Sequence, residues 1–146
     1  HMLSNTSRYA IRALIYLAIN TTEKRKIGIK RIADDLNIPS PFLGKILQTL
    51  TKQKILASTK GPNGGFGINN TTLNVSLMDI VRIIDGDELF DQCLISNRVC
   101  GGIEGDMCSL HTHYEGIRKQ LRKLFSEHTI GKLAQEFNIS EGKIEI

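Results

Sequence analysis

Hydrophobic residues recur with helical spacing in the first part of the chain. One apolar face predicts a helix from about Ser4 to Asn20, and it consists of Ala10, Ala13, Leu14, Leu17 and Ala18. Ile11, Ile15 and Ile19 form a second face, so this helix is apolar on two sides. A helix of this kind lies between two layers, and another subunit is a candidate for the second layer.

Two shorter helices are expected next. Pro39 ends the first of them, because a residue that precedes a proline is pushed away from the helical region. Ser40 and Pro41 predict the N-cap and first residue of the second. The apolar positions of the two helices are Ile29, Ile32, Ala33 and Leu36, then Leu43, Ile46, Leu47 and Leu50. Two short helices joined by a tight turn predict a helix-turn-helix.

A β-hairpin is predicted after these helices. Residues 55–59 and 66–68 are permissive for strands, and the glycine-rich segment Gly61–Gly65 separates them. A helix-turn-helix followed by a hairpin is the order of a winged helix, in which the wing lies on the DNA backbone or in the minor groove. The expected fold is therefore mainly α, a winged helix-turn-helix with a small β-hairpin wing.

The second half of the chain predicts a dimerisation helix. Ser76 and Asp79 form a capping box for a helix that stops at Gly86. Further on, apolar residues are spaced four, three, four and three apart, at Leu110, Tyr114, Ile117, Leu121 and Leu124. This spacing is typical of a helix that pairs with another helix, and packing on its own domain is the alternative. A short helix capped by Thr129 is expected to run to about Phe137.

These elements predict four regions. They are a DNA-binding domain at 3–86, a cysteine-containing loop at 87–109, the dimerisation helix with the terminal helix at 110–138, and a tail at 139–146.

Charge is distributed unevenly along the chain. Residues 1–75 hold eleven Lys/Arg and three Asp/Glu, whereas residues 76–146 hold eight and twelve, for a net charge of +4. A basic half is the footprint of a surface that meets phosphates, and a solvated basic face is the plainer alternative. The longest apolar run, Ala13–Ile19, is far too short for a bilayer and follows no secretion signal, so a cytoplasmic protein without a membrane partner is expected.

The second helix of a helix-turn-helix presents its first turns to base edges. Ser40 and Gln48 can hydrogen-bond bases, and Lys45 can pair with guanine or phosphate. Glycines in the wing allow main-chain N–H groups to approach a phosphate, and a tight turn is the plainer reason for them. The residues expected to contact DNA are Ser40, Pro41, Phe42, Lys45, Gln48, Thr49, Lys52, Lys60, Gly61, Asn63, Gly64 and Gly65.

All three cysteines of the chain fall within nineteen residues, together with a histidine, as Cys93, Cys100, Cys108 and His111. An odd number of cysteines in a reducing compartment argues against a disulfide framework. Thiolates near an imidazole bind zinc or an iron-sulfur cluster. The spacing lacks the paired ligands of a zinc finger, which favours a cluster modestly over zinc, and independent buried cysteines are a third alternative.

Four segments in the same order resemble the Rrf2 family of bacterial transcription regulators. They are Ser7–Ala10, Ile38–Leu47, the wing Lys60–Phe66 and the cysteine-histidine set. The resemblance runs from Leu3 to about Ala134. It implies a homodimer of winged helices that acts as a repressor on a palindromic operator in double-stranded DNA. It also implies a cluster in each subunit, through which the protein senses cluster, redox or nitric oxide status. No small-molecule substrate is expected.

The resemblance also implies a ligand set. By position, the three cysteines and His111 resemble the ligands of a 2Fe-2S site in IscR-like members. Members that hold a 4Fe-4S cluster take a carboxylate from the first helix, where this chain has Arg8, so 2Fe-2S is expected in preference to 4Fe-4S. The cysteines here are more widely spaced than in IscR-like members, and Glu104, Asp106 and His113 are alternative fourth ligands.

Three positions in the recognition segment depart from the family pattern. Pro41 replaces the residue that IscR-like members carry there. Gly44 stands where IscR-like members carry a glutamate, so their discrimination between two operator classes is not expected here. Phe42 stands where tyrosine is common, which keeps the ring and loses the hydroxyl.

Two other functions are weighed against a cluster-controlled regulator. The first keeps DNA binding and makes the cysteines a thiol switch or a structural zinc site. The second is an iron-sulfur carrier or electron-transfer protein that does not bind DNA. An enzyme is not expected, because the chain offers no pairing of nucleophile and base, and Gly61–Gly65 lacks the Lys-Ser/Thr of a phosphate loop.

Overall fold

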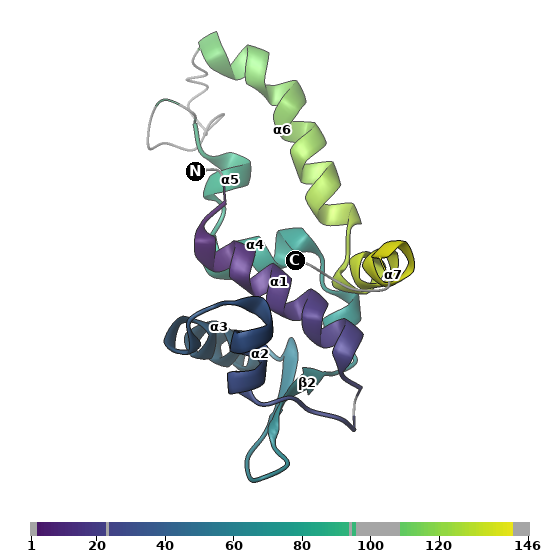
Figure 1. Ribbon diagram of the computed structural model, residues 1–146. Coiled ribbons are helices and arrows are strands. Elements are labelled where there is room, and N and C mark those ends of the chain that lie inside the picture. The colour runs from purple at the N-terminus through teal and green to yellow at the C-terminus, as the bar shows by residue number, and fades with distance from the viewer. Residues whose placement is uncertain (1–2, 23, 94, 96–108, 142–146) are drawn as a thin grey trace.

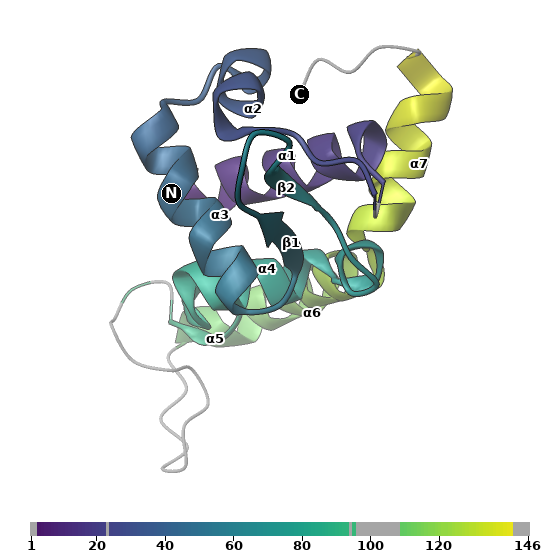
Figure 2. The same ribbon diagram turned by 90° about the horizontal axis from the view of Figure 1, so that it is seen from below.

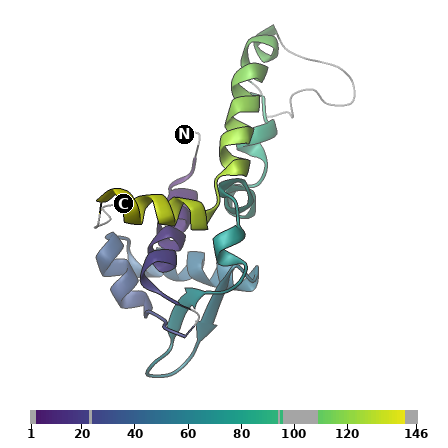
Figure 3. The same ribbon diagram turned by 90° about the vertical axis from the view of Figure 1, so that its right-hand side faces the viewer.

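The computed structural model describes residues 3–22, 24–93, 95 and 109–141, with side chains to Phe137 (Figure 1). Three helices and a hairpin form a winged body, and a long helix projects away from it (Figure 3). In chain order the elements are α1 (Asn5–Asn20), α2 (Ile29–Leu36), α3 (Ser40–Lys52), β1 (Leu56–Thr59), β2 (Gly65–Ile68), the 3-10 helix η1 (Thr72–Asn74), α4 (Leu77–Asp85), α5 (Glu88–Asp91), α6 (Ser109–Glu127) and α7 (Ile130–Glu141). The predicted mainly α, winged helix-turn-helix fold is confirmed.

Helix α1 lies at the centre of the body and packs on α3, α4 and α7. Its predicted first face is buried at Ala10, Ala13, Leu14 and Leu17, which are fully inaccessible, and half-buried at Ala18. On its second face Ile15 is buried and Ile19 half-buried, in the same hydrophobic cluster as Ile130 of α7. The second layer therefore comes from the C-terminal helix of the same chain, and the expectation of another subunit at this face is corrected.

The helix-turn-helix forms as predicted, with a small difference at the start of α3. The stripe Leu43, Ile46, Leu47 and Leu50 is at most 3% exposed. Asn37 ends α2 in the left-handed conformation, with φ 55°, a conformation that asparagine tolerates better than most residues. Pro39 is the N-cap of α3, and its carbonyl accepts from the Leu43 N–H at 3.0 Å. Ser40 is thus the first helical residue and makes no side-chain cap.

The wing is a two-stranded antiparallel hairpin in which Leu56 lies opposite Ile68 and Thr59 opposite Gly65. Ile27, from the chain between α1 and α2, exchanges two backbone hydrogen bonds of 2.8 and 2.9 Å with Phe66. Phe66 also pairs with Ser58, so β2 lies between β1 and this added segment (Figure 2). The wing is therefore fixed to the rest of the body along its second edge.

Helix α4 joins the winged body to α6. The predicted capping box of Ser76 and Asp79 is present, and Gly86 ends the helix with φ 78°. Met78 and Val81 of α4 share a small core with Phe90 and Phe125, whose rings meet edge to face at 5.6 Å. This second core holds α5 and the lower half of α6 against α4.

The junction between α6 and α7 is bound to the start of α4. The Leu77 N–H donates to the His128 carbonyl and the Ile130 N–H to the Val75 carbonyl, both at 3.0 Å. The Thr129 hydroxyl accepts from the Lys132 N–H at 3.2 Å, as its predicted capping role requires. The helix continues beyond Phe137 to Glu141. None of the helices described in residues 3–141 is long and apolar enough to span a membrane.

Candidate functional site

The residues predicted to contact DNA gather on one side of the body, on α3 and the wing. In α3 the Phe42 ring is 61% exposed, and Lys45, Gln48 and Thr49 face solvent while the opposite side of the helix is buried. Ser40, Pro41, Lys52, Lys60, Gly61 and Asn63 are also exposed. Gly44 is half-buried, and a Cβ there would lie 3.3 Å from the Ile29 side chain, so this position faces α2.

Two wing glycines have a structural reason beyond the two weighed from the sequence. A Cβ on Gly64 would lie 2.3 Å from the Thr59 carbonyl oxygen, and the Gly64 N–H already donates to Gly61 at 2.9 Å. A Cβ on Gly65, where φ is +141°, would lie 2.3 Å from the Ile27 oxygen. Close packing of backbone requires these two glycines. At Gly61, with φ +104° and open space around it, the turn conformation is the reason.

Gly65→Ala is expected to lower the free energy of unfolding by about 1–2 kcal/mol, because the strained φ and the contact with Ile27 force the wing off its edge partner. Thermal unfolding at a fixed protein concentration measures this. Asn63→Ala, at an exposed neighbouring position, is the control and should change little. An unchanged melting temperature for Gly65→Ala would show that the wing is not held by Ile27.

The predicted ligands are only partly within the described residues. Cys93 follows α5 and is half-buried, and His111 lies in the first turn of α6. Cys100 and Cys108 lie outside the described residues, as do Glu104 and Asp106. Within the part of the chain that the structure describes, no three His, Cys, Asp or Glu side chains are grouped as a metal site requires. Arg8 and the alternative ligand His113 are exposed.

The two ring nitrogens of His111 have different environments. It is 9% exposed, and its Nε2 lies 3.3 Å from Oε2 of Glu115. Its Nδ1 is buried and has no hydrogen-bond partner among the described residues. Glu115 favours the tautomer with the proton on Nε2, which leaves the lone pair on Nδ1. A buried imidazole nitrogen with this lone pair is suited to a metal ligand, so this residue fits the donor set inferred from the sequence.

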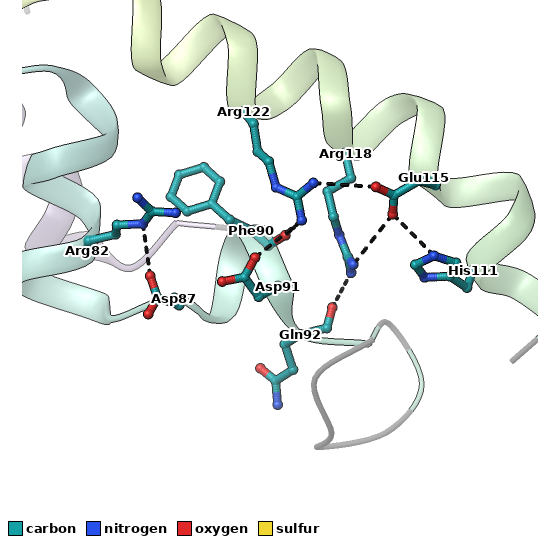
Figure 4. A network of polar contacts seen from close by, with 9 residues as sticks. All are labelled: Arg82, Asp87, Phe90, Asp91, Gln92, His111, Glu115, Arg118 and Arg122. Atoms are coloured by element: carbon teal, nitrogen blue, oxygen red, sulfur yellow. Dashed lines mark hydrogen bonds and ion pairs between the residues drawn. The ribbon is translucent and has the colours of Figure 1, made fainter. Parts of the chain in front are cut away.

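Two arginines of α6 hold the chain that leads into Cys93 (Figure 4). Arg118, 1% exposed, donates to the Gln92 carbonyl and stacks on the Tyr114 ring with its Cζ 5.0 Å from the centroid. Arg122 donates to the Phe90 carbonyl at 2.8 Å and to the Asp91 carboxylate at 3.2 Å. The end of α5 is therefore clamped on α6 immediately before the first cysteine.

Glu115 connects these arginines to His111. Its carboxylate lies 3.3 Å from His111, 3.9 Å from Arg118 and 3.4 Å from Arg122. One side chain thus links the two described ends of the cysteine segment, Gln92–Cys93 and Ser109–His111. The sequence analysis missed this network, although its four members are spaced four, three and four apart on α6 and a search for polar stripes would have found them.

The apolar residues predicted as a dimer seam divide into two groups. Leu121 packs on the second core and Tyr114 is half-buried beside Arg118, whereas Leu110, Ile117 and Leu124 are 37%, 58% and 50% exposed. These three are seven residues apart and so lie in one line along α6. We call Leu110, Ile117 and Leu124 the α6 stripe.

The profile of the Rrf2 family, described as an iron-dependent transcriptional regulator, matches residues 3–136. The chain belongs to the Rrf2 family. A predicted HTH-type transcriptional regulator of Aquifex aeolicus is 32% identical over 96% of this Rrf2 chain and 94% of its own length. Among solved structures, CymR, the global cysteine regulator of B. subtilis, has a TM-score of 0.74 and 19% identity, covering 92% of this chain and 96% of its own. IscR of T. potens has a TM-score of 0.73 and 17% identity, covering 99% and 92%.

Membership of the Rrf2 family establishes the general role. This Rrf2 protein is a DNA-binding transcriptional regulator, and it is not an enzyme. The alternative of an electron carrier that does not bind DNA is therefore set aside.

Proposed function

We propose that this Rrf2 protein is a homodimeric repressor of a palindromic operator, controlled by an iron-sulfur cluster, 2Fe-2S in preference to 4Fe-4S. The proposed ligands are Cys93, Cys100, Cys108 and His111. One observation supports the cluster site above all. The buried His111 Nδ1 has no partner among the described residues, while Nε2 of the same ring is linked through Glu115 and Arg118 to the chain beside Cys93.

The chain's own residues prepare this site from one side. Glu115 orients the His111 ring through Nε2, which is the usual arrangement for a ligating histidine. Arg118 fixes the Gln92 carbonyl and with it the direction in which Cys93 leaves α5. A cluster bound there would be a redox-active group, and both its presence and its oxidation state would depend on the redox condition of the cell.

The proposed response passes through α6. Glu115, Arg118 and Arg122 contact both ends of the cysteine segment, so a change in the segment alters contacts of α6 directly. The α6 stripe is the proposed dimer seam, which makes α6 the element that sets the spacing of the two α3 helices. This coupling requires that the cluster bind the two arrangements of the dimer with different free energies.

In the proposed complex, α3 enters the major groove and the wing meets the minor groove or the backbone. Phe42, Lys45 and Gln48 would face base edges, and Lys52 and Lys60 would contact phosphates. We propose four regions for the chain. They are the DNA-binding domain at 3–86, the cysteine-containing segment at 87–109, the dimerisation helix with α7 at 110–138, and a tail at 139–146.

The test compares protein purified without oxygen before and after removal of its cluster. Iron and sulfide content and the visible spectrum report the cluster, and binding to a duplex selected by the protein from a random pool reports operator affinity at matched salt. We expect the two forms to differ by about fivefold or more in affinity, which is the usual range of allosteric coupling. Equal affinities would rule out cluster control.

Two histidine variants test the ligand set. His111→Ala is expected to change the visible spectrum and to lower the iron bound per chain, because it removes the buried Nδ1. His113→Ala is the matched control, since His113 is exposed and lies two residues further along α6. An unaltered spectrum in His111→Ala would remove His111 from the site.

A thiol switch is the second candidate. It is favoured by the likeness of the fold to CymR and by Cys93, which is only half-buried. A protein of this kind would contain no iron or sulfide after anaerobic purification, and its affinity for the selected duplex would respond to thiol oxidants. Metal analysis of the same sample also distinguishes structural zinc from both.

A further inference from the structure

A basic hollow lies beside the wing, on the edge away from β1. It has a volume of about 500 Å³ and lies between the chain leading into α2 and the tip of the hairpin. Four cations contribute to its wall, Lys24, Arg25, Lys26 and Arg31, together with Pro62 and Gly64 of the wing. No Asp or Glu is among the described residues that line it. We call it the wing-edge hollow.

The cations are carried by ordered backbone. Ile27 is 5% exposed and is hydrogen-bonded to Phe66 in the sheet. Thr22 and Arg25 exchange two backbone hydrogen bonds of 3.3 Å, and the Thr22 hydroxyl accepts from the Lys24 and Arg25 N–H groups. Hydrogen bonds to Thr22 therefore hold the backbone of Lys24 and Arg25, which lowers the entropy lost when these residues hold a ligand.

The hollow is electrostatically suited to an anion. Arg31 lies 3.8 Å from Asp35, but both side chains are largely exposed, so this pair is weak and the guanidinium keeps most of its field. Asp35 also accepts from the Tyr16 hydroxyl at 2.5 Å, and burial and this hydrogen bond raise the pKa of Tyr16 to about 12. Gly28, which lines the hollow, is the N-cap of α2 and offers no side-chain cap, so the positive end of this helix opens there.

The position of the hollow indicates which anion it takes. β1 continues from α3, and β2 separates β1 from the segment that carries Lys24 and Arg25 (Figure 2). A wing in a minor groove has a phosphate backbone on each side, since the groove is only about 6 Å wide. In such a complex α3 and Lys60 would face one of these backbones, and the hollow would face the other.

We propose that the wing-edge hollow seats a backbone phosphate of duplex DNA across the minor groove from α3. The proposal rests on the proposed mode of DNA binding through α3 and the wing. Because phosphates are the same in every sequence, this contact contributes affinity and positions the wing without reading bases.

The test uses the full chain with Lys24→Ala and Arg25→Ala combined. Binding is measured over a salt series to two duplexes of equal length, one selected by the wild type from a random pool and one of random sequence. We expect a loss of about three- to tenfold on both duplexes, with the slope of log affinity against log salt reduced by about one to two. The matched control combines Lys119→Ala and Lys123→Ala, which are exposed on α6.

The outcomes separate the two proposals. If the wild type binds and the variant keeps its slope and affinity, the phosphate seat is wrong and DNA binding through α3 stands. A loss confined to the selected duplex would also overturn the seat, because it would show base reading. A wild type without salt-dependent binding to either duplex would overturn both. The variant's melting temperature should equal that of the wild type, since both side chains are exposed.

Discussion

Ile117→Glu is expected to convert the protein to a monomer and to lower its affinity for a two-half-site operator about 100-fold or more. Ile117 is the most exposed member of the α6 stripe, at 58%, and lies in its centre. Two copies that face each other along this stripe would bring two glutamates together in an apolar seam, where an unpaired charge is costly. A monomer then loses the gain in affinity that comes from holding both half-sites, about 10²–10⁴-fold.

Analytical ultracentrifugation gives the oligomeric state, and binding to the selected duplex gives the affinity. Ser126→Glu is the matched control, because it adds the same charge at an exposed position on the far side of the same helix. The control should remain a dimer. A dimeric Ile117→Glu variant would place the dimer interface somewhere other than the α6 stripe.

Arg118→Ala is expected to lower the free energy of unfolding by about 3 kcal/mol. The guanidinium is buried and its loss leaves the Gln92 carbonyl without a donor, opens a cavity beside Tyr114 and removes one cation from Glu115. Removal of one partner from a buried charged network costs about 3–5 kcal/mol, and the lower figure applies here because Glu115 is 30% exposed. If Arg118 made only solvent-exposed ion pairs, its removal would lower the free energy of unfolding by less than about 1 kcal/mol.

Urea unfolding at one protein concentration measures this loss, with the denaturant slope as a check on the unfolded state. Lys119→Ala is the control, since Lys119 is exposed and adjacent in sequence. We also expect Arg118→Ala to weaken the dependence of operator affinity on the cluster, because the end of α5 is no longer clamped to α6. A variant as stable as the control would show that Arg118 does not hold α5.

The local order of the chain could be predicted from the sequence because each element carries its own signals. The stripe of α3 and the capping box of Ser76 and Asp79 depend on residues within a few positions of one another. The packing of α7 on α1 depends on contacts between the two ends of the chain. The apolar second face of α1 predicts that another element packs on it. The sequence does not show whether that element is a partner subunit or a distant helix of the same chain, because either would bury the same residues.

The site was predicted less completely than the fold. The cysteines and His111 are visible because their residue types are rare and suited to metal, whereas Glu115, Arg118 and Arg122 are common on the surfaces of helices. The burial of Arg118 and its contacts with Gln92 and Tyr114 distinguish it from a solvated arginine, and they depend on the tertiary structure. The wing glycines were noticed in the sequence, where phosphate contact and a tight turn were the two reasons weighed. The structure adds a third reason for Gly64 and Gly65, because the backbone of Thr59 and Ile27 fills the space that a Cβ would need.

The backbone bridge between Ser76 and Thr129 has a consequence for how motion reaches DNA. The bridge fixes the C-terminal end of α6 beside the winged body. From there the nineteen residues of the helix extend roughly 28 Å to His111 and the cysteine segment. In the proposed response α6 would therefore pivot about its attachment to the winged body. A tilt of roughly 5° would displace the far end by about 2 Å. In a dimer joined along α6, the same tilt would rotate the two DNA-binding domains relative to one another. Operator affinity would then change while the winged core stays as it is.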